Sequence, residues 1–295
     1  MNMIATPTFH YRAIWISDIH LGTRGCNADI LMDFLRRTES DYLYLVGDIV
    51  DIWRMRKNWY WHQTHNDIIQ KVMRKARKGT RVIYVPGNHD ESFRDFAPRR
   101  FGRVAILREA HHITADGRRF LVLHGDQFDG VVKHAKWLAI VGDSAYNFAL
   151  ALNLWFNYAR RKLGFSYWSL SAFLKHKVKN AVQFICCFEE AVVAEARRQG
   201  ADGVIAGHIH TAEMREIDGI LYCNDGDWVE SCTALVEHND GSMEILRWAE
   251  MDEVKQMYSK TVTEKYATEK VQCESSLSPM PGFLRSMASF VRLKP

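Results

Sequence analysis

The chain has 295 residues, of which 47% are hydrophobic, and it carries a formal net charge of +4. This length and composition suit one large domain, or a domain with an insertion, and so small a net charge excludes a protein that wraps nucleic acid. We expect neither an export signal nor a membrane span, because no basic segment precedes an apolar one at the N-terminus and no run of about 18 apolar residues occurs.

Short segments rich in β-branched and aromatic residues alternate with segments of helical periodicity. The expected strands are Arg12–Ser17, Tyr42–Val46, Arg81–Val85, Phe120–Leu123, Gly203–Ala206, Ile220–Cys223, Ala234–Glu237 and Ser242–Trp248. The expected helices are Ala28–Arg37, Thr64–Lys78 and Glu189–Gln199. Asn239-Asp240-Gly241 predicts a hairpin turn between the last two strands. The alternation predicts an α/β protein whose sheet is largely buried on both faces.

Two stretches depart from this alternation. Residues 131–188 are rich in aromatic and basic residues and compatible with helix, which predicts a helical insertion within a domain of residues 1–250. Between Val131 and Gly200 the chain has ten Lys or Arg and four Asp or Glu, a local net charge of +6. Residues 251–295 are polar and rich in Ser, Thr, Lys and Glu, which predicts a weakly ordered C-terminal tail.

Side chains that can bind a metal follow five of the expected strands. The motifs are Asp18-Ile19-His20, Gly47-Asp48-Ile49-Val50-Asp51, Gly87-Asn88-His89-Asp90, His124-Gly125-Asp126 and Gly207-His208-Ile209-His210. All lie at the carboxyl ends of strands, where α/β sheets build their sites. Alone, each motif is more often a cap, a turn or an exposed histidine. Five in order, each directly after a strand, indicate one metal site.

Ligand chemistry narrows the kind of metal. Carboxylate, imidazole and amide oxygen together suit Mn, Fe or Zn and do not suit a thiolate site. The six cysteines agree with this, because they follow no metal-binding or disulfide spacing. Free thiols in a reducing, cytoplasmic compartment are therefore expected.

The motifs DIH, GDIVD, GNHD, HGD and GHIH, in this order, resemble those of the calcineurin-like metallophosphoesterase superfamily. The resemblance implies an enzyme with a four-layer α/β/β/α sandwich and two divalent metal ions at the strand ends, Mn or else Fe or Zn. It assigns the first metal to Asp18, His20 and His210, the second to Asn88, His124 and His208, and the bridging position to Asp48.

The resemblance also implies a reaction. Two cations about 3.5–4 Å apart clamp a phosphate and yield a bridging hydroxide that attacks phosphorus. His89 is expected to face the phosphate, where it stabilises developing charge or protonates the leaving oxygen. Asp51 is expected to orient His89, and the amide of Asn88 is expected to contact both metal and phosphate.

The basic and apolar insertion is similar to that of the UDP-2,3-diacylglucosamine diphosphatases of lipid A synthesis. Members of that branch hydrolyse the pyrophosphate of a lipid-linked nucleotide sugar to UMP and a lipid 1-phosphate. They act as peripheral proteins at the cytoplasmic face of the inner membrane. The implied partner is thus a phosphorylated lipid, and the expected substrate contacts are Ser171, Lys175, Lys179 and Asn180.

Other interpretations stay open at this point. Many members of that branch carry Arg where this chain has His89, so a phosphodiesterase or phosphatase acting on nucleotides or another soluble phosphoester is an alternative. The insertion would then pack on the core as an amphipathic hairpin with its basic residues in solvent. A non-catalytic scaffold is a second alternative, although it should have lost ligands or His89. A nucleic-acid partner is not expected, because no binding module is recognisable.

Two further polar groups have two interpretations each. Asp126 and Asp129 follow His124 closely and either orient metal ligands or cap their loop. Asn224-Asp225-Gly226-Asp227 follows another expected strand and either lines the site or forms a turn.

Overall fold

The computed structural model of the protein describes residues 9–129, 185 and 187–251. The chain divides into two compact units, Met1–Trp248 and Ala249–Pro295, and the fold below is that of the first. The expected insertion and C-terminal tail fall almost entirely outside the described residues, as do the expected substrate contacts Ser171, Lys175, Lys179 and Asn180. No helix in the described part of the chain is long and apolar enough to cross a membrane.

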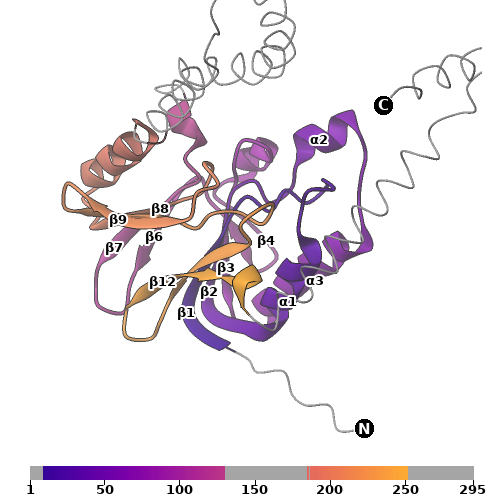
Figure 1. Cartoon of the computed structure of the whole chain (residues 1–295), viewed down its shortest axis with the longest axis horizontal. Helices are drawn as coiled ribbons and strands as arrows, with labels where there is room; N and C mark the ends of the chain where they lie inside the picture. Colours follow the sequence, from indigo (N-terminus) through magenta and orange to yellow (C-terminus); the bar gives the residue numbers. More distant parts are fainter. Residues whose placement is uncertain (1–8, 130–184, 186, 252–295) are drawn as a thin grey trace, which may run out of the picture. The chain divides into compact units, whose positions relative to one another are not determined.

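A seven-stranded sheet forms one half of the unit (Figure 1). Its strands, in spatial order, are β12 (Met243–Arg247), β11 (Thr233–Glu237), β1 (Phe9–Ile16), β2 (Thr38–Val46), β3 (Arg81–Val85), β5 (Val104–Ile106) and β4 (Arg99–Phe101). The four strands β1, β2, β3 and β5 run parallel, and the others pair antiparallel. The carboxyl ends of β1, β2 and β3 therefore lie side by side at one edge.

A five-stranded sheet forms the other half. Its strands, in spatial order, are β6 (Ala110–Ile113), β7 (Arg119–Val122), β8 (Gly203–Ala206), β10 (Ile220–Asn224) and β9 (Glu213–Ile217). The three central strands are parallel, and the two edge strands pair antiparallel to their neighbours. Parallel central strands again bring the loops that follow them to one edge.

Side-chain alternation along the strands produces the layers. Phe120 and Val122 pack between the two sheets against Trp15 of β1, whereas Leu121, one residue along, faces Phe188 on the opposite side. Phe188 belongs to the helical segment 187–198, which covers that side of the five-stranded sheet. Residues that alternate along a strand point to opposite faces, so one strand serves two cores.

Two helices cover the outer face of the seven-stranded sheet (Figure 1). They are α1 (Ala28–Arg37) and α3 (Gln63–Lys78). Ile68 and Val72 of α3 face Leu45 of β2. The order of layers is therefore helix, sheet, sheet, helix, which confirms the predicted four-layer α/β/β/α fold.

The sequence located most elements. Helix α1 and strands β3 and β8 have the predicted bounds, whereas β1 and β2 begin earlier, at Phe9 and Thr38, because these residues pair in the parallel ladder. The predicted strand Ser242–Trp248 is wrong at its end, since Trp248 begins the 3₁₀ turn η3 (Trp248–Glu250).

Several short elements were not predicted. They are the helix α2 (Ile52–Lys57), the strands β4, β5, β6 and β9, and the 3₁₀ turns η1 (Glu91–Phe96) and η2 (Asp126–Phe128). Each spans only three to six residues. A hydrophobic period is not readable over so few residues.

The core between the sheets should respond strongly to truncation. Phe120 is fully buried there, and its ring lies against Gly203, where a Cβ atom would come within 2.3 Å of it. Phe120→Ala should lower the free energy of unfolding by about 3–5 kcal/mol, measured by urea denaturation. Phe96→Ala, at a half-exposed ring, is the matched control and should change it by roughly 0.5 kcal/mol or less. Equal effects of the two changes would contradict this packing.

Candidate dimetal site

The loops that follow five parallel strands meet at one edge of the two sheets. Backbone hydrogen bonds join them, because Asp18 N–H donates to Gly47 O at 3.0 Å and His20 N–H donates to Asp48 O at 2.9 Å. A bond across the sheets is also present, from His208 N–H to the Asp18 carboxylate at 2.8 Å. These bonds bring side chains from both halves of the chain to one place.

Among the described residues, three groups of side chains could each hold a metal ion, and two of them contain only predicted ligands. The third, His20, Asp51 and His89, shares His20 with the first of these two clusters. In the first, the ligand atoms of Asp18, His20 and His210 lie within 4.8 Å of one another. In the second, Asp48 joins His124 and His208 within the same limit. Together the two clusters contain six of the seven predicted ligands, all except Asn88.

Asp48 lies between the two clusters. Its Oδ2 atom is 3.5 Å from His124 Nε2 and 3.9 Å from His20 Nε2. Its Oδ1 atom accepts a hydrogen bond of 2.8 Å from the backbone N–H of His89. A carboxylate in this position has an oxygen directed toward ligands of both clusters, as a bridging residue requires.

The buried polar atoms of the site test whether it fits metal ions. Asp18 Oδ1, His20 Nε2, Asn88 Oδ1 and His124 Nε2 are all buried and make no hydrogen bond of ordinary geometry, although Asp18 Oδ1 lies 3.0 Å from His210 Nε2. A buried polar atom left without a partner costs about 1–3 kcal/mol. All four are atoms through which these residues ligate divalent cations, so bound cations would satisfy them. The donor set therefore fits the two metals.

Backbone conformation marks the same residues. Seven non-glycine residues in the described part of the chain have positive φ, and five of them are predicted ligands. These five are Asp18 (50°), His20 (54°), Asp48 (53°), His208 (71°) and His210 (54°). Non-glycine residues held in this region are strained and cluster at functional sites. The strained positions were not readable from sequence and point to the same site independently.

Two glycines make the close approach possible. A Cβ atom at Gly47 would lie 2.2 Å from His124 Nδ1, and one at Gly87 would lie 2.2 Å from Asp48 Oδ1. Gly47 also has a φ of +82°, which other residues rarely adopt. Any larger residue at either position would displace a candidate ligand.

His89 and Asp51 lie beside the two clusters. The Nδ1 atom of His89 is 2.9 Å from Asp51 Oδ1, which leaves its Nε2 atom on the side of Asp48, 3.9 Å away. Asp51 Oδ2 is 3.1 Å from Nδ1 of His20, and Oδ1 caps α2 by accepting from Arg54 N–H. Asp51 thus contacts a candidate ligand and the predicted phosphate-side residue together.

The environment keeps Asp51 ionised. Burial raises the pKa of this carboxyl group, but hydrogen bonds with His20, His89 and the Arg54 N–H outweigh burial and hold the pKa well below its usual range. An ionised carboxylate favours a proton on the Nδ1 atom of each neighbouring imidazole. The Nε2 atom of His20 is then left for a metal.

Each of three candidate ligand histidines contacts a further group, and some of these groups lie outside the five motifs. His124 Nδ1 lies 2.8 Å from Val46 O, and His208 Nε2 lies 2.7 Å from Asp129 Oδ1. His210 Nδ1 is 3.2 Å from Asp227. Such partners fix the orientation of ligand imidazoles.

These contacts decide between the earlier interpretations. Asp129 and Asp227 contact candidate ligands, whereas Asp126 pairs with Arg94 at 2.5 Å and does not. Asp90, the last residue of GNHD, was given no role from sequence. It is buried and accepts from the backbone N–H groups of Ile49 (2.7 Å), Val50 (3.3 Å) and Gly87 (2.6 Å), which ties the loop after β2 to the loop after β3.

Three candidate ligand imidazoles hold protons tightly. Burial lowers the pKa of each, but neighbouring carboxylates outweigh burial. These are chiefly Asp18 and Asp51 at His20, Asp48 at His124, and Asp18 and Asp227 at His210. The pKa rises to about 9 in His20 and to about 10 in His124 and His210. In the metal-free protein these raised pKa values stabilise the fold fully below the ordinary pKa of about 6.5, and this stabilisation is lost as pH rises toward 9–10.

Metal binding should therefore strengthen as pH rises. A metal needs neutral imidazoles and must displace these protons, so its affinity should increase by roughly tenfold per pH unit for each proton released. Titration calorimetry with Mn²⁺ near pH 6 and pH 8, in buffers of different ionisation enthalpy, measures both the affinity and the protons released. Equal affinity at both pH values with no proton release would contradict the predicted ligand set.

The fold and the site together define a metal-dependent hydrolase of the four-layer α/β class. The chain belongs to the calcineurin-like phosphoesterase family, whose family model matches residues 11–212, more than half of its length. It is accordingly a phosphoester hydrolase. A search of curated proteins gave no match to this sequence.

Several solved structures are similar to the chain. YfcE, a phosphoesterase from E. coli, is 12% identical with a TM-score of 0.40, covering 80% of this chain and 98% of that one. Vps29 from Entamoeba histolytica in complex with Zn²⁺ is 14% identical with a TM-score of 0.38, covering 80% and 97%. A predicted phosphoesterase from Streptococcus pneumoniae is 14% identical with a TM-score of 0.35, covering 80% and 88%. Because these TM-scores are low, the assignment to the calcineurin-like phosphoesterase family rests on the match to the family model.

Proposed function

We propose that the chain hydrolyses UDP-2,3-diacylglucosamine to UMP and the lipid 1-phosphate with the help of two divalent metal ions, most readily Mn²⁺. In this reaction the oxygen of a water molecule bonds to the phosphorus of the UMP group. The P–O bond to the bridging oxygen breaks, and that oxygen leaves with the lipid phosphate. The products together contain one water molecule more than the substrate.

One observation carries the hydrolytic part of this proposal. Candidate ligands from five loops converge, and four of their ligand atoms are buried without a hydrogen bond of ordinary geometry. We assign the first metal to Asp18, His20 and His210, the second to Asn88, His124 and His208, and the bridge to Asp48. When bound, two divalent cations neutralise phosphate charge and make a water molecule more acidic.

Residues of the chain position the phosphate and protonate the leaving oxygen. Asp51 Oδ1 lies 2.9 Å from the Nδ1 atom of His89, so the imidazolium form of that ring would keep its Nδ1–H on Asp51 and present its Nε2–H to the phosphate or to the leaving oxygen. The amide of Asn88 can present its oxygen to a metal and its NH₂ group to a phosphate oxygen. Asp90 keeps the loops that carry Asp48 and Asn88 together.

Two features support an amphiphilic substrate. The sequence of residues 131–188 combines many large apolar side chains with basic ones, as a lid over acyl chains and phosphates would require. Next to the reaction centre, the ring of Trp53 lies against His89, with centroids 4.6 Å apart, and is 41% exposed. We place further substrate contacts at Ser171, Lys175, Lys179 and Asn180, and the enzyme at the cytoplasmic face of the inner membrane as a peripheral protein.

The test compares two substrates in the presence of Mn²⁺. UDP-2,3-diacylglucosamine should yield UMP, whereas bis-p-nitrophenyl phosphate should be cleaved slowly. Cleavage of the generic diester without turnover of the lipid would overturn the substrate and leave the hydrolytic site intact. It would favour a soluble phosphoester, which is the alternative suggested by His89 in place of the arginine common in this branch.

A further inference from the structure

Two cavities adjoin on the side of the seven-stranded sheet that α3 covers. The first has a volume of about 320 Å³ and lies between the sheet and α3. Its described lining is apolar throughout except for Tyr84. The second is a groove of about 490 Å³ along α3, and it shares Ile69 and Met73 with the first. A ligand could therefore occupy both.

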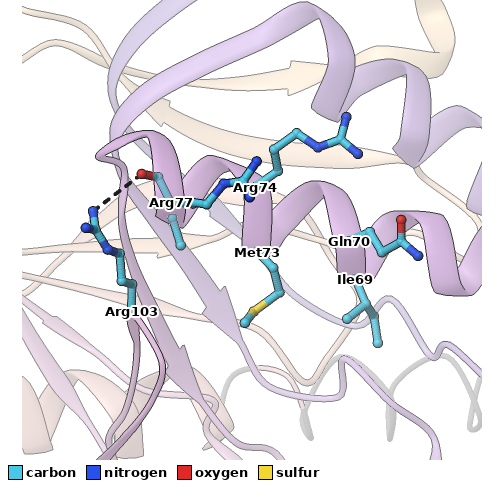
Figure 2. Close-up of a pocket in the computed structure, with 7 residues that line it drawn as sticks. Ile69, Gln70, Met73, Arg74, Arg77 and Arg103 are labelled. Atoms are coloured by element: carbon cyan, nitrogen blue, oxygen red, sulfur yellow. Dashed lines mark hydrogen bonds between the residues drawn. The ribbon is translucent and has the colours of Figure 1, made fainter.

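The apolar surface of α3 is wider than the part that its neighbours cover. Ile68 and Val72 are buried, but Ile69 and Met73, one residue further along the helix, are 39% and 38% exposed. Residues four apart lie next to each other on a helix, and Figure 2 shows both side chains pointing to the same side of α3. Phe101 of β4, which lines the same cavity, is 70% exposed. Exposed apolar groups gathered at a cavity mark a binding site.

The groove beside this apolar mouth is basic. Arg74, Arg77 and Arg103 line it, and no Asp or Glu is among the described residues that line either cavity. Arg103 reaches from the β4–β5 hairpin to the end of α3, where it donates to Arg77 O at 3.4 Å (Figure 2). The charge of the groove is thus complementary to an anion, and arginine is the side chain best suited to carboxylate or phosphate.

We propose that the two cavities together bind a single-chain anionic amphiphile, with its acyl chain in the apolar cavity and its carboxylate or phosphate head group against the arginines. An inorganic anion would leave the apolar cavity unfilled, and an uncharged hydrocarbon would leave the arginines without a counter-charge. The volume of the apolar cavity lies at the lower end of the roughly 300–1,000 Å³ typical of small-ligand sites, which suits one chain. The inference does not depend on the substrate proposed above.

The test uses dodecanoate below its micelle concentration as the probe, with titration calorimetry on the full chain. Met73→Glu, which places a carboxylate at the mouth, and the double change Arg74→Glu with Arg77→Glu should each weaken binding by at least about tenfold, which is about 1.4 kcal/mol. All three positions are exposed on α3, so the variants should fold. The matched controls are Ile113→Glu on β6 and the pair Arg197→Glu with Arg247→Glu, and they should bind as the wild type does.

A second arm distinguishes a free amphiphile from a lipid in a bilayer. The same variants are sedimented with phosphatidylglycerol vesicles and with phosphatidylcholine vesicles. Dodecanoate binding that the α3 variants weaken supports the proposal, whereas variant-sensitive binding to anionic vesicles without binding of dodecanoate would overturn it in favour of a bilayer lipid. Binding of neither probe, or binding that the α3 variants do not change, would overturn the proposal. Hydrolysis of bis-p-nitrophenyl phosphate by Met73→Glu should equal that of the wild type, so failure at the metal site is recognised separately.

Discussion

Asp48→Asn should abolish turnover, with a loss of about 10³-fold or more. The change keeps the size of the side chain and the oxygen that accepts from the His89 N–H at 2.8 Å, but it removes the negative charge between the two clusters. Charge stabilisation by a metal is worth several kcal/mol, and each 1.36 kcal/mol corresponds to about tenfold in rate. Steady-state hydrolysis and metal content by mass spectrometry measure the two consequences.

The matched control for this change lies on β2, the strand that precedes Asp48. Asp41 is exposed on β2, so Asp41→Asn removes the same charge away from the site and should leave both readouts at wild-type values. Asp48→Asn protein that retained two metals and wild-type turnover would show that Asp48 does not bridge.

His89→Ala should slow hydrolysis by about 10²–10⁴-fold and leave the metal content at two per chain. The imidazole lies 2.9 Å from Asp51 and is assigned to the phosphate side of the site, so its loss should remove a proton donor and not a ligand. The limb of the pH–rate profile that reports the catalytic acid should disappear with it.

A distant histidine provides the control. His238 is partly exposed and pairs with Glu244, and no candidate ligand contacts it in the described part of the chain, so His238→Ala should have wild-type kinetics. Loss of metal from His89→Ala would show that His89 is itself a ligand. Unchanged turnover would exclude its role at the leaving oxygen.

The layers of the fold and the location of the site could largely be predicted from the sequence, because the polar residues of the motifs directly follow recognisable strands along the chain. Each candidate ligand directly follows a strand with a clear apolar pattern, and the parallel arrangement of those strands follows from the helices between them. Asp18 and His208 could be placed at one edge although 190 positions separate them.

Other parts of the site depend on contacts that no local pattern reveals. Asp90 accepts from Ile49 and Val50, forty or so positions earlier, and Asp129 contacts His208 across the site. Trp53 reaches His89 only because Asp51 starts α2, a helix too short to show a period. Such residues become recognisable only when the chain is folded.

The positive φ angles of the candidate ligands lower the free energy of unfolding. An L-residue in the left-handed region costs roughly 1–2 kcal/mol, and glycine is free of this penalty. At His210 a change to Gly would remove this penalty, but it would also remove the ion pairs of that imidazole with Asp18 and Asp227, which stabilise the metal-free fold at neutral pH. A scaffold with no use for metals would have no need to hold five non-glycine residues in this region. Their presence at all five strained positions argues that this chain has kept a working metal centre.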